Sequence, residues 1–302
     1  MNIIAVLNVA GGTMRSLDVA DVTRRLEEGL GEKGHTVQVE AMEPNRLGAA
    51  LEKIAGRKDV DALLIGGGDG TVSSAAAALA GSEVALGVLP LGTMNLFARD
   101  LKVPLDLDSA IAALAEGEIE SIDLGQVNGT LFVNHCSIGL HPWMIRHREH
   151  QQKWIGRRKW FAMARAWMRA LKRFPRVDIE MRVGGERRHL RTNVLIIANN
   201  PFREGAGPIP GHEHLDEHAL AVYVAKSASR LGLVRLIFNA TMGHWSTNPM
   251  LDSFVTPSIT LTRRRRKTVR ASIDGETRAV TAPLVAKSLP AALKVLKPKA
   301  PE

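Results

Sequence analysis

The sequence predicts an α/β fold: an N-terminal parallel-sheet domain, then a C-terminal antiparallel, β-rich and sandwich-like domain. Short apolar runs alternate with helical patterns up to about residue 116, which is typical of a parallel sheet with crossover helices. After about residue 120, most runs are β-like. The length of 302 residues fits about two domains of roughly 150 residues each. We expect domains at 1–120 and 121–302, with a C-terminal segment that can pack back on the first domain.

The first domain is predicted from continuous apolar runs that suit buried strands and from amphipathic stretches between them. The expected strands are Ile3–Leu7, Val37–Val39, Ala62–Ile65 and Ala85–Leu89. The expected helices are Val19–Leu30, Leu47–Ala55 and an alanine-rich helix that begins at Val72.

The second domain begins with a hairpin pattern. Ile122–Val127 and Thr130–Ile138 flank Asn128-Gly129, and Asn-Gly is the strongest short-range hairpin signal. Further β-like runs predict strands at Val177–Val183, Asn193–Ala198, Leu220–Val224, Ile259–Thr262, Val269–Ile273 and Thr277–Thr281.

The composition narrows the function classes. The 40 lysines and arginines exceed the 31 acids, which gives a net charge of +9 and favours phosphate, nucleic acid or an anionic membrane surface as a partner. The single cysteine, Cys136, excludes an internal disulfide and a four-cysteine zinc site, and we expect it in the core. No apolar run approaches the roughly 18 residues of a transmembrane helix. The N-terminus lacks the charged start of a signal peptide, so a cytoplasmic protein is expected.

A glycine-rich loop follows the third expected strand. Gly66–Thr71 reads GGGDGT at a strand-to-helix junction, where backbone N–H groups and a helix N-terminus can receive phosphate. It is neither a Walker A loop nor a dinucleotide fingerprint, because it lacks the lysine of the first and the last glycine of the second. The alternative is an Asp-Gly turn with Thr71 capping the next helix.

A second loop follows the next strand, with Pro90 and Gly92 shaping the turn. Thr93 is expected to cap a helix whose apolar face carries Phe97 and Leu101. An ordinary strand-to-helix connection would look similar. Three such loops, at Asn8, Gly67 and Gly92, at one edge of one sheet predict a nucleotide cleft.

These motifs resemble the diacylglycerol kinase catalytic-domain family, which includes bacterial lipid kinases, sphingosine kinases and ceramide kinases. The resemblance rests on GGDGT at Gly67–Thr71 and LPLGTMNLFAR at Leu89–Arg99. It also covers the first-strand motif at Asn8–Gly12, NHCSIG at Asn134–Gly139 and Asp-Gly-Glu at Asp274–Glu276, and so spans nearly the whole chain.

The resemblance implies an ATP- and Mg²⁺-dependent lipid kinase with its active site between the domains. Asp69 would lie near the phosphates and magnesium, and Asp274 and Glu276 would activate the acceptor hydroxyl. The residues implied in nucleotide binding are Asn8, Gly67, Gly68, Asp69, Gly70, Thr71, Gly92, Thr93 and Asn95.

The chain departs from the family pattern at three places. Val9 replaces a proline, Ser73-Ser74 replaces Asn-Glu, and Leu96 replaces an aspartate. The absence of the acid at Leu96 is shared with sphingosine kinases, which favours a sphingoid or ceramide substrate over diacylglycerol. The loss of Asn-Glu leaves open a catalytically weak lipid-binding relative, and an NAD kinase-like enzyme is the other kinase alternative.

The Asp-Gly-Glu motif has an ordinary explanation, because Asp-Gly is a common hairpin turn. A kinase needs a carboxylate near the attacking hydroxyl, however, and Asp274 and Glu276 are the only acids between Phe254 and Val295. Beside the nucleotide loops, we assign the pair to catalysis, with Glu276 as the base and Asp69 as a third catalytic acid.

The segment Gly211–His218 reads GHEHLDEH and fits a three-residue zinc-peptidase pattern, His214-x-x-Glu217-His218. The prolines before it and the β-like run after it favour a solvated loop over a zinc hydrolase site. The family resemblance adds an alternative, a structural Mg²⁺ in this turn, with Glu217 at the position of the usual aspartate.

Four of the five tryptophans lie between Trp143 and Trp167 in a region dense in arginine and lysine. Apolar anchors beside a basic face describe a helix at a membrane interface, with Trp154, Trp160 and Trp167 as anchors, or a helix packed on the second domain. We expect peripheral association with an anionic membrane at its cytoplasmic face. No nucleic-acid module is apparent, and the sequence carries no sign of an oligomeric state.

Overall fold

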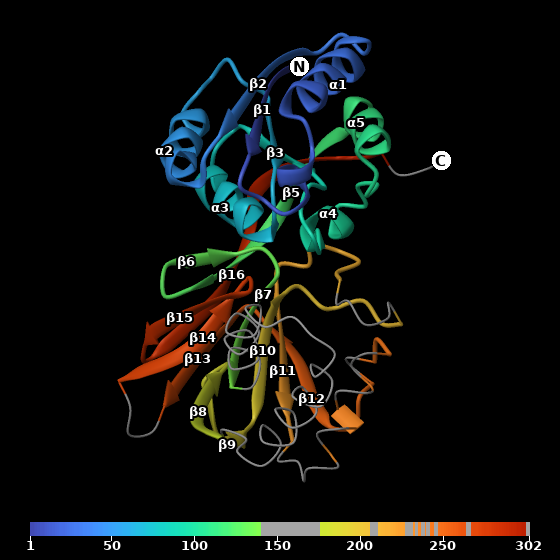
Figure 1. Cartoon of the computed structure of the whole chain (residues 1–302). Coiled ribbons are helices and arrows are strands. Elements are labelled where there is room, and N and C mark those ends of the chain that lie inside the picture. Colours follow the sequence, from blue (N-terminus) through green and yellow to red (C-terminus); the bar gives the residue numbers. More distant parts are fainter. Residues whose placement is uncertain are drawn as a thin grey trace, which may run out of the picture.

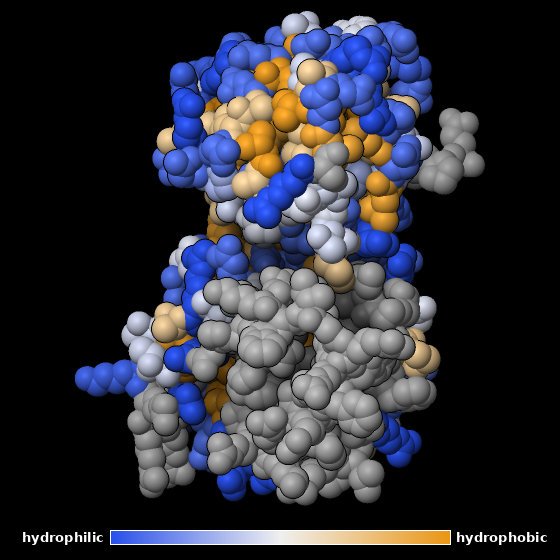
Figure 2. Space-filling view, viewed as in Figure 1, coloured by the Kyte–Doolittle hydropathy of each residue, from blue (hydrophilic) through white to orange (hydrophobic). Residues whose placement is uncertain are grey.

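The computed structural model describes residues 1–139, 176–205, 211–226, 247–263 and 267–299, together with a few residues between 232 and 244. It has two lobes, an α/β domain and a β-rich domain, joined by long strands (Figure 1). In the space-filling view the molecule narrows to a waist between the lobes (Figure 2). No helix among the described residues is long and apolar enough to span a bilayer.

The N-terminal domain is built on a parallel sheet with the strand order β2-β1-β3-β4. Helices α2 and α3 pack together on one side of this sheet, and α1 and α5 on the other (Figure 1). The strands are β1 (Asn2–Asn8), β2 (Thr36–Met42), β3 (Ala62–Gly66) and β4 (Ala85–Leu89). The helices are η1 (Thr13–Ser16), α1 (Val19–Gly31), α2 (Pro44–Ala55), α3 (Asp69–Leu79), α4 (Leu96–Asp100) and α5 (Leu107–Ala115).

The predicted elements of this domain are confirmed, and the local chemistry explains their boundaries. Asp18 caps α1, because its side chain accepts a hydrogen bond from Ala20 N at 3.0 Å. Pro44 begins α2, where a missing N–H costs no helical hydrogen bond. Strands β3 and β4 are buried along their whole length, as continuous apolar runs predict.

The C-terminal domain packs two largely antiparallel sheets against each other around one apolar core. The first continues the N-terminal sheet in the order β4-β16-β13-β8-β9, and the second has the order β12-β11-β10-β7-β14-β15. The remaining strands are β5 (Glu118–Val127), β6 (Thr130–Phe132), β7 (His135–Gly139), β8 (Val177–Val183), β9 (Glu186–Thr192), β10 (Val194–Asn199), β11 (Leu220–Ala225), β12 (Leu251–Thr256), β13 (Ser258–Arg263), β14 (Thr268–Ile273), β15 (Glu276–Thr281) and β16 (Leu284–Lys297). The predicted α/β class with a sandwich-like second domain is confirmed.

Two strands connect the domains. β5 and β16 pair with each other along most of their length, and Val295 of β16 also pairs in parallel with Leu86 of β4. The C-terminal strand therefore completes the N-terminal sheet, so each lobe contains residues from distant parts of the chain.

The sequence pattern erred at the first β run of the second domain. The Asn128-Gly129 hairpin forms, with φ of 45° and 85° at these residues, but it joins β5 to the short β6 only. The predicted strand Thr130–Ile138 is two strands, because the chain leaves β6 and begins β7 in the other sheet.

Candidate active site

The glycine-rich loop lies between β3 and α3, at the point where the strand order reverses direction. β1 separates β2 from β3, so the loops after β1 and β3 leave the sheet next to each other. Asn8 at the end of β1 donates a hydrogen bond from Nδ2 to Thr71 Oγ1 at 2.8 Å. This contact ties the first-strand motif to the glycine loop.

The loop is not the Asp-Gly turn that was its ordinary alternative. Helix α3 begins at Asp69, three residues before the predicted start, and its N-cap is Gly68. Thr71 lies inside the first helical turn and does not cap it, so the structure does not support that alternative. Asp69 and Gly70 are therefore the first two residues of a helix of eleven residues, where backbone N–H groups have no partner within the helix.

The glycines of this loop fall into two classes when a Cβ atom is placed on each. At Gly66 and Gly67 a Cβ would collide with neighbouring side chains, at 2.8 Å from Leu7 Cδ2 and from Thr71 respectively. At Gly68 a Cβ meets nothing within 4 Å, although φ of −83° suits any residue. Local packing thus explains the first two glycines and leaves open space beside Gly68.

The second loop, between β4 and α4, is held by Asn95. Its Oδ1 accepts from Gly92 N at 2.8 Å, and its Nδ2 donates to Pro90 O at 3.2 Å. Asn95 has a left-handed φ of 51° and is the N-cap of α4. The prediction that Thr93 caps this helix was therefore wrong, and Thr93 is exposed.

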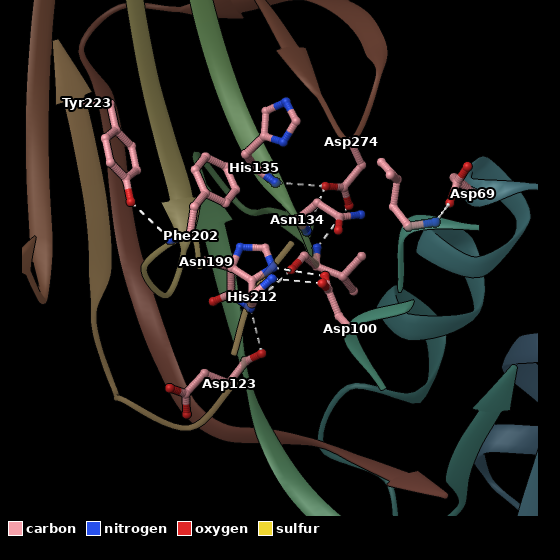
Figure 3. Close-up of polar contacts among 12 residues, drawn as sticks. Asp69, Asp100, Asp123, Asn134, His135, Asn199, Phe202, His212, Tyr223 and Asp274 are labelled. Carbon is pink, nitrogen blue, oxygen red and sulfur yellow. Dashed lines mark hydrogen bonds and ion pairs between the residues drawn. The ribbon is translucent and has the colours of Figure 1, made fainter. Parts of the chain in front are cut away.

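The two loops touch each other through one carboxylate. Asp69 Oδ1 accepts a hydrogen bond from Leu96 N at 2.7 Å, so the first N–H of α4 orients the acid of the glycine loop (Figure 3). A Cβ on Gly92 would lie 2.9 Å from Gly68 Cα and 3.0 Å from Gly67 O. A Cβ on Gly12 would lie 3.4 Å from Thr93 Oγ1, so the residues predicted on three loops are brought together.

Asp274 occupies the turn between β14 and β15 and is both a turn residue and an interaction centre. With φ of 45° it is followed by Gly275 at 88°, the geometry of an Asp-Gly hairpin. Its carboxylate accepts from the N–H groups of Val133 (2.9 Å), Asn134 (2.9 Å) and His135 (3.1 Å), as Figure 3 shows in part. Ser73 Oγ donates the fourth bond at 2.9 Å, from the other domain.

Burial raises the pKa of Asp274, and the four hydrogen bonds to its carboxylate oppose that rise. Ser73 stands at the position of the family's asparagine, and its hydroxyl supplies a hydrogen-bond donor between the two domains. Its neighbour Ser74 is exposed and donates to Gly70 O in its own helix.

Glu276 lies one residue beyond the turn, with an exposed side chain. Its Oε2 pairs with Arg278 at 2.7 Å. Its Oε1 lies 3.6 Å from the position that a Cβ on Gly70 would take. The hairpin of the C-terminal domain thus brings a carboxylate against the glycine loop of the N-terminal domain.

The histidine segment does not form the helix that a zinc-peptidase pattern requires. His212–Ala219 follows an irregular course of bends, with His214 and Glu217 exposed. His218 Nδ1 pairs with the buried Asp123 Oδ1 at 2.9 Å, and Glu217 N donates to Asn200 Oδ1 at 3.1 Å. Among the described residues, no group of three or more histidines, cysteines or acids lies close enough together to hold a metal.

The predicted membrane residues Trp154, Trp160 and Trp167 lie outside the described residues. Cys136 is in the core of the second domain, as predicted. Burial, with a smaller contribution from the charge of Asp274, raises the pKa of its thiol to about 12.

Sequence reasoning missed two buried acids near the domain junction. Asp100, the last residue of α4, accepts from His212 N at 2.8 Å and pairs with His212 Nδ1 at 2.9 Å. Asp123 of β5 accepts from His218 and from Ala291 N at 3.0 Å. An acid between apolar neighbours, as Asp123 is between Ile122 and Leu124, was the only available sign, and Asp100 lacks even that because Arg99 precedes it.

Mg²⁺ fits the site by donor chemistry. Mg²⁺ is usually held by one or two carboxylates together with substrate phosphates. Asp69 projects from the glycine loop with one carboxylate oxygen occupied by Leu96 N, which leaves its second oxygen for a cation. Glu276 of the opposing domain lies across Gly70.

Comparison with known proteins agrees with this geometry over nearly the whole chain. Residues 2–127 match the family model described as "Diacylglycerol kinase catalytic domain". Residues 142–297 match the one described as "YegS C-terminal NAD kinase beta sandwich-like domain". The chain belongs to the diacylglycerol kinase family. It is a lipid kinase.

Relatives of this lipid kinase extend across both domains. A protein of Mycobacterium tuberculosis named "Diacylglycerol kinase" is 29% identical over 251 residues, covering 80% of this chain and 78% of its own. A Pseudomonas aeruginosa protein named "Probable lipid kinase YegS-like" is 48% identical over 79 residues, 26% of each chain. The crystal structure of a diacylglycerol kinase from Bacillus anthracis covers 98% of this chain and 96% of its own, with a TM-score of 0.73 and 16% identity, which shows a shared fold.

Proposed function

We propose that this lipid kinase transfers the γ-phosphoryl group of ATP to a primary hydroxyl of a membrane lipid, with Glu276 as the general base. The observation that carries the proposal is the position of Glu276 Oε1 against Gly70 of the glycine loop. A phosphate held by that loop would lie on the same side as the carboxylate, which is where an attacking hydroxyl must be.

The N-terminal domain would bind the nucleotide. The backbone at Gly67, Gly68 and Gly70 can approach phosphate oxygens closely, and the open space beside Gly68 suits a ligand better than a side chain would. Gly92, Thr93 and Asn95 would border the nucleotide from the second loop, with Asn8 fixing Thr71 behind the first.

Mg²⁺, held by Asp69 and the ATP phosphates, would neutralise charge that builds up during phosphoryl transfer. The protein's own residues then supply position and proton transfer. Glu276 would accept the proton of the lipid hydroxyl, and Arg278 would hold the Glu276 side chain toward the loop. Asp274 would act by fixing the turn, because its oxygens already accept four hydrogen bonds.

Diacylglycerol is the first acceptor to test, because the Mycobacterium tuberculosis relative that matches most of the chain is named for it. Leu96 in place of an acid favours a sphingoid base or ceramide as the alternative. Phosphate transfer from [γ-³²P]ATP should be measured across diacylglycerol, sphingosine, ceramide and NAD in mixed micelles. Transfer to a lipid that is lost in Glu276→Gln supports the proposal, whereas transfer to NAD alone contradicts it.

We place the kinase at the cytoplasmic face of the membrane as a peripheral protein. A lipid acceptor requires access to a bilayer, and a net charge of +9 favours anionic head groups. Co-sedimentation with phosphatidylglycerol-containing vesicles should fall as salt rises, because salt screens such attraction. Binding that is insensitive to salt would argue against an electrostatic contact.

A further inference from the structure

Helix α4 is anchored at both ends by carboxylates. At its first residue, Leu96 N donates to Asp69 Oδ1 at 2.7 Å, which connects the helix to the glycine loop. At its last residue, Asp100 accepts from His212 of the C-terminal domain through both the backbone N–H at 2.8 Å and Nδ1 at 2.9 Å. One short helix thus connects the second domain to the acid of the glycine loop (Figure 3).

The contact between Asp100 and His212 is tightly enclosed. The side chains of His212 and Asp100 are 1% and 3% exposed. Among the described residues, no lysine or arginine forms an ion pair with Asp100. Its carboxylate therefore depends on the hydrogen bonds from the backbone N–H and the imidazole Nδ1–H of His212. Losing the imidazole would leave the carboxylate under-satisfied in a site that water does not reach.

His212 is itself fixed within the C-terminal domain. Its ring lies against Phe202, with centroids 5.1 Å apart, and Phe202 stacks on Tyr223 of β11 at 5.2 Å. A β-bridge also joins Phe202 to His212. Contacts therefore run from Tyr223 of β11 through the rings of Phe202 and His212 to Asp100. Helix α4 then joins Asp100 to Asp69.

We propose that His212 is a positioning residue for the kinase reaction: it docks the C-terminal domain onto α4 and so holds Asp69 in its orientation toward Mg²⁺ and ATP. The inference rests on the proposed nucleotide site. It explains why Asp100 and His212 are buried together where the two domains meet. It also predicts that a change in the lipid-binding domain weakens nucleotide binding.

The test is the affinity of Mg²⁺ and a non-hydrolysable ATP analogue, measured by calorimetry, beside the KM for lipid. His212→Leu should weaken nucleotide affinity by about five-fold or more, the usual scale of coupling between sites, and leave the lipid KM nearly unchanged. His212→Asn, whose side-chain N–H can donate near the Nδ1 position, should restore most of the affinity. A merely structural role in the C-terminal domain would change the lipid KM instead.

The matched control is His189→Leu. His189 pairs with Asp178 at 2.6 Å, but this pair is exposed and joins β8 to β9, at the end of the C-terminal domain remote from α4 (Figure 1). Nucleotide affinity should be unchanged there. If His212→Leu does not fold, Asp100→Asn decides, because it keeps one acceptor for the two donors and should give a smaller loss of affinity.

Two outcomes separate this inference from the proposed function. Asp69→Asn that leaves nucleotide affinity intact would contradict the proposed nucleotide site itself. Asp69→Asn that weakens binding, together with folded His212→Leu or Asp100→Asn that binds the nucleotide as tightly as the unaltered protein, would overturn the role of His212 alone. Hydrogen exchange adds a structural check, since amides 96–101 should lose protection in His212→Leu and keep it in His189→Leu.

Discussion

Replacing the two acids of the Asp-Gly-Glu hairpin by their amides should have different effects: Asp274→Asn should lower stability, and Glu276→Gln should lower activity. Asp274→Asn replaces one carboxylate oxygen by an amide that faces N–H and O–H donors, so two of four hydrogen bonds are lost. At about 1–3 kcal/mol for each of the two enclosed donors left unpaired, the free energy of unfolding should fall by roughly 2–6 kcal/mol. Glu276 has an exposed side chain and one ion pair, so Glu276→Gln should change stability by less than about 0.5 kcal/mol.

The rate of phosphoryl transfer should depend on Glu276, the acid whose substitution hardly changes stability. Glu276→Gln should lower the rate of phosphoryl transfer by about 10²–10⁴-fold, the contribution of a general base, with nucleotide affinity unchanged. Urea denaturation measures the first effect and single-turnover transfer measures the second. Glu186→Gln is the control, because Glu186 and Arg188 form the same exposed pair two residues apart, at 2.9 Å, on β9.

Two results would refute this reasoning. A folded Glu276→Gln variant with a near-normal rate would remove Glu276 as the base and leave Asp69 as the remaining candidate. An Asp274→Asn variant as stable as the unaltered chain would show that the four hydrogen bonds do not hold the turn.

Four further changes test the loops and the core. Gly68→Ala should fold normally but bind Mg·ATP at least about ten-fold more weakly, because its Cβ fills open space where phosphate would lie. The control is Gly48→Ala in α2, where a Cβ also meets no atom within 4 Å, and this variant should bind Mg·ATP normally. Gly92→Ala should impair both folding and binding, since its Cβ meets Gly68 Cα at 2.9 Å, which a thermal melt would detect. Ser73→Ala should cost about 0.5–1.5 kcal/mol in urea denaturation through its lost bond to Asp274, and Ser74→Ala much less. With a pKa of about 12, Cys136 stays a thiol at pH 8 and should resist iodoacetamide until the protein unfolds. The folded state favours the protonated thiol. This group's contribution to the free energy of unfolding is therefore full below about pH 9 and is lost as the pH rises toward 12.

Elements whose packing follows from local pattern were predictable from the sequence. The buried runs of β3 and β4 and the amphipathic α1 depend only on hydrophobic periodicity. Strand β9 was missed because it is an edge strand of the sheet with the polar sequence ERRHLRT, so no apolar alternation marks it. β16 was missed because Pro290 interrupts it and because its partners β4 and β5 lie far away in sequence.

In the candidate site, too, the residues in local motifs were predictable and those that make long-range contacts were not. The glycine loop and the Asp-Gly-Glu hairpin are recognisable as motifs, and the structure brings Gly70 and Glu276 together. What holds them together comes from residues with no motif of their own: Ser73, Asp100 and His212 form contacts between side chains more than 100 residues apart. Such pairs depend on how two domains meet, which a single sequence does not encode as a local pattern.

These contacts bear on whether the departures from the family pattern weaken catalysis. Ser73 retains a donor to Asp274, so the loss of asparagine does not release the hairpin. Leu96 stands where the family has an acid, and its backbone N–H donates to Asp69. If Asp69 holds Mg²⁺ as proposed, its orientation through α4 and His212 would matter for activity. Loss of that orientation would then weaken the enzyme, although Ser73 keeps its bond to Asp274.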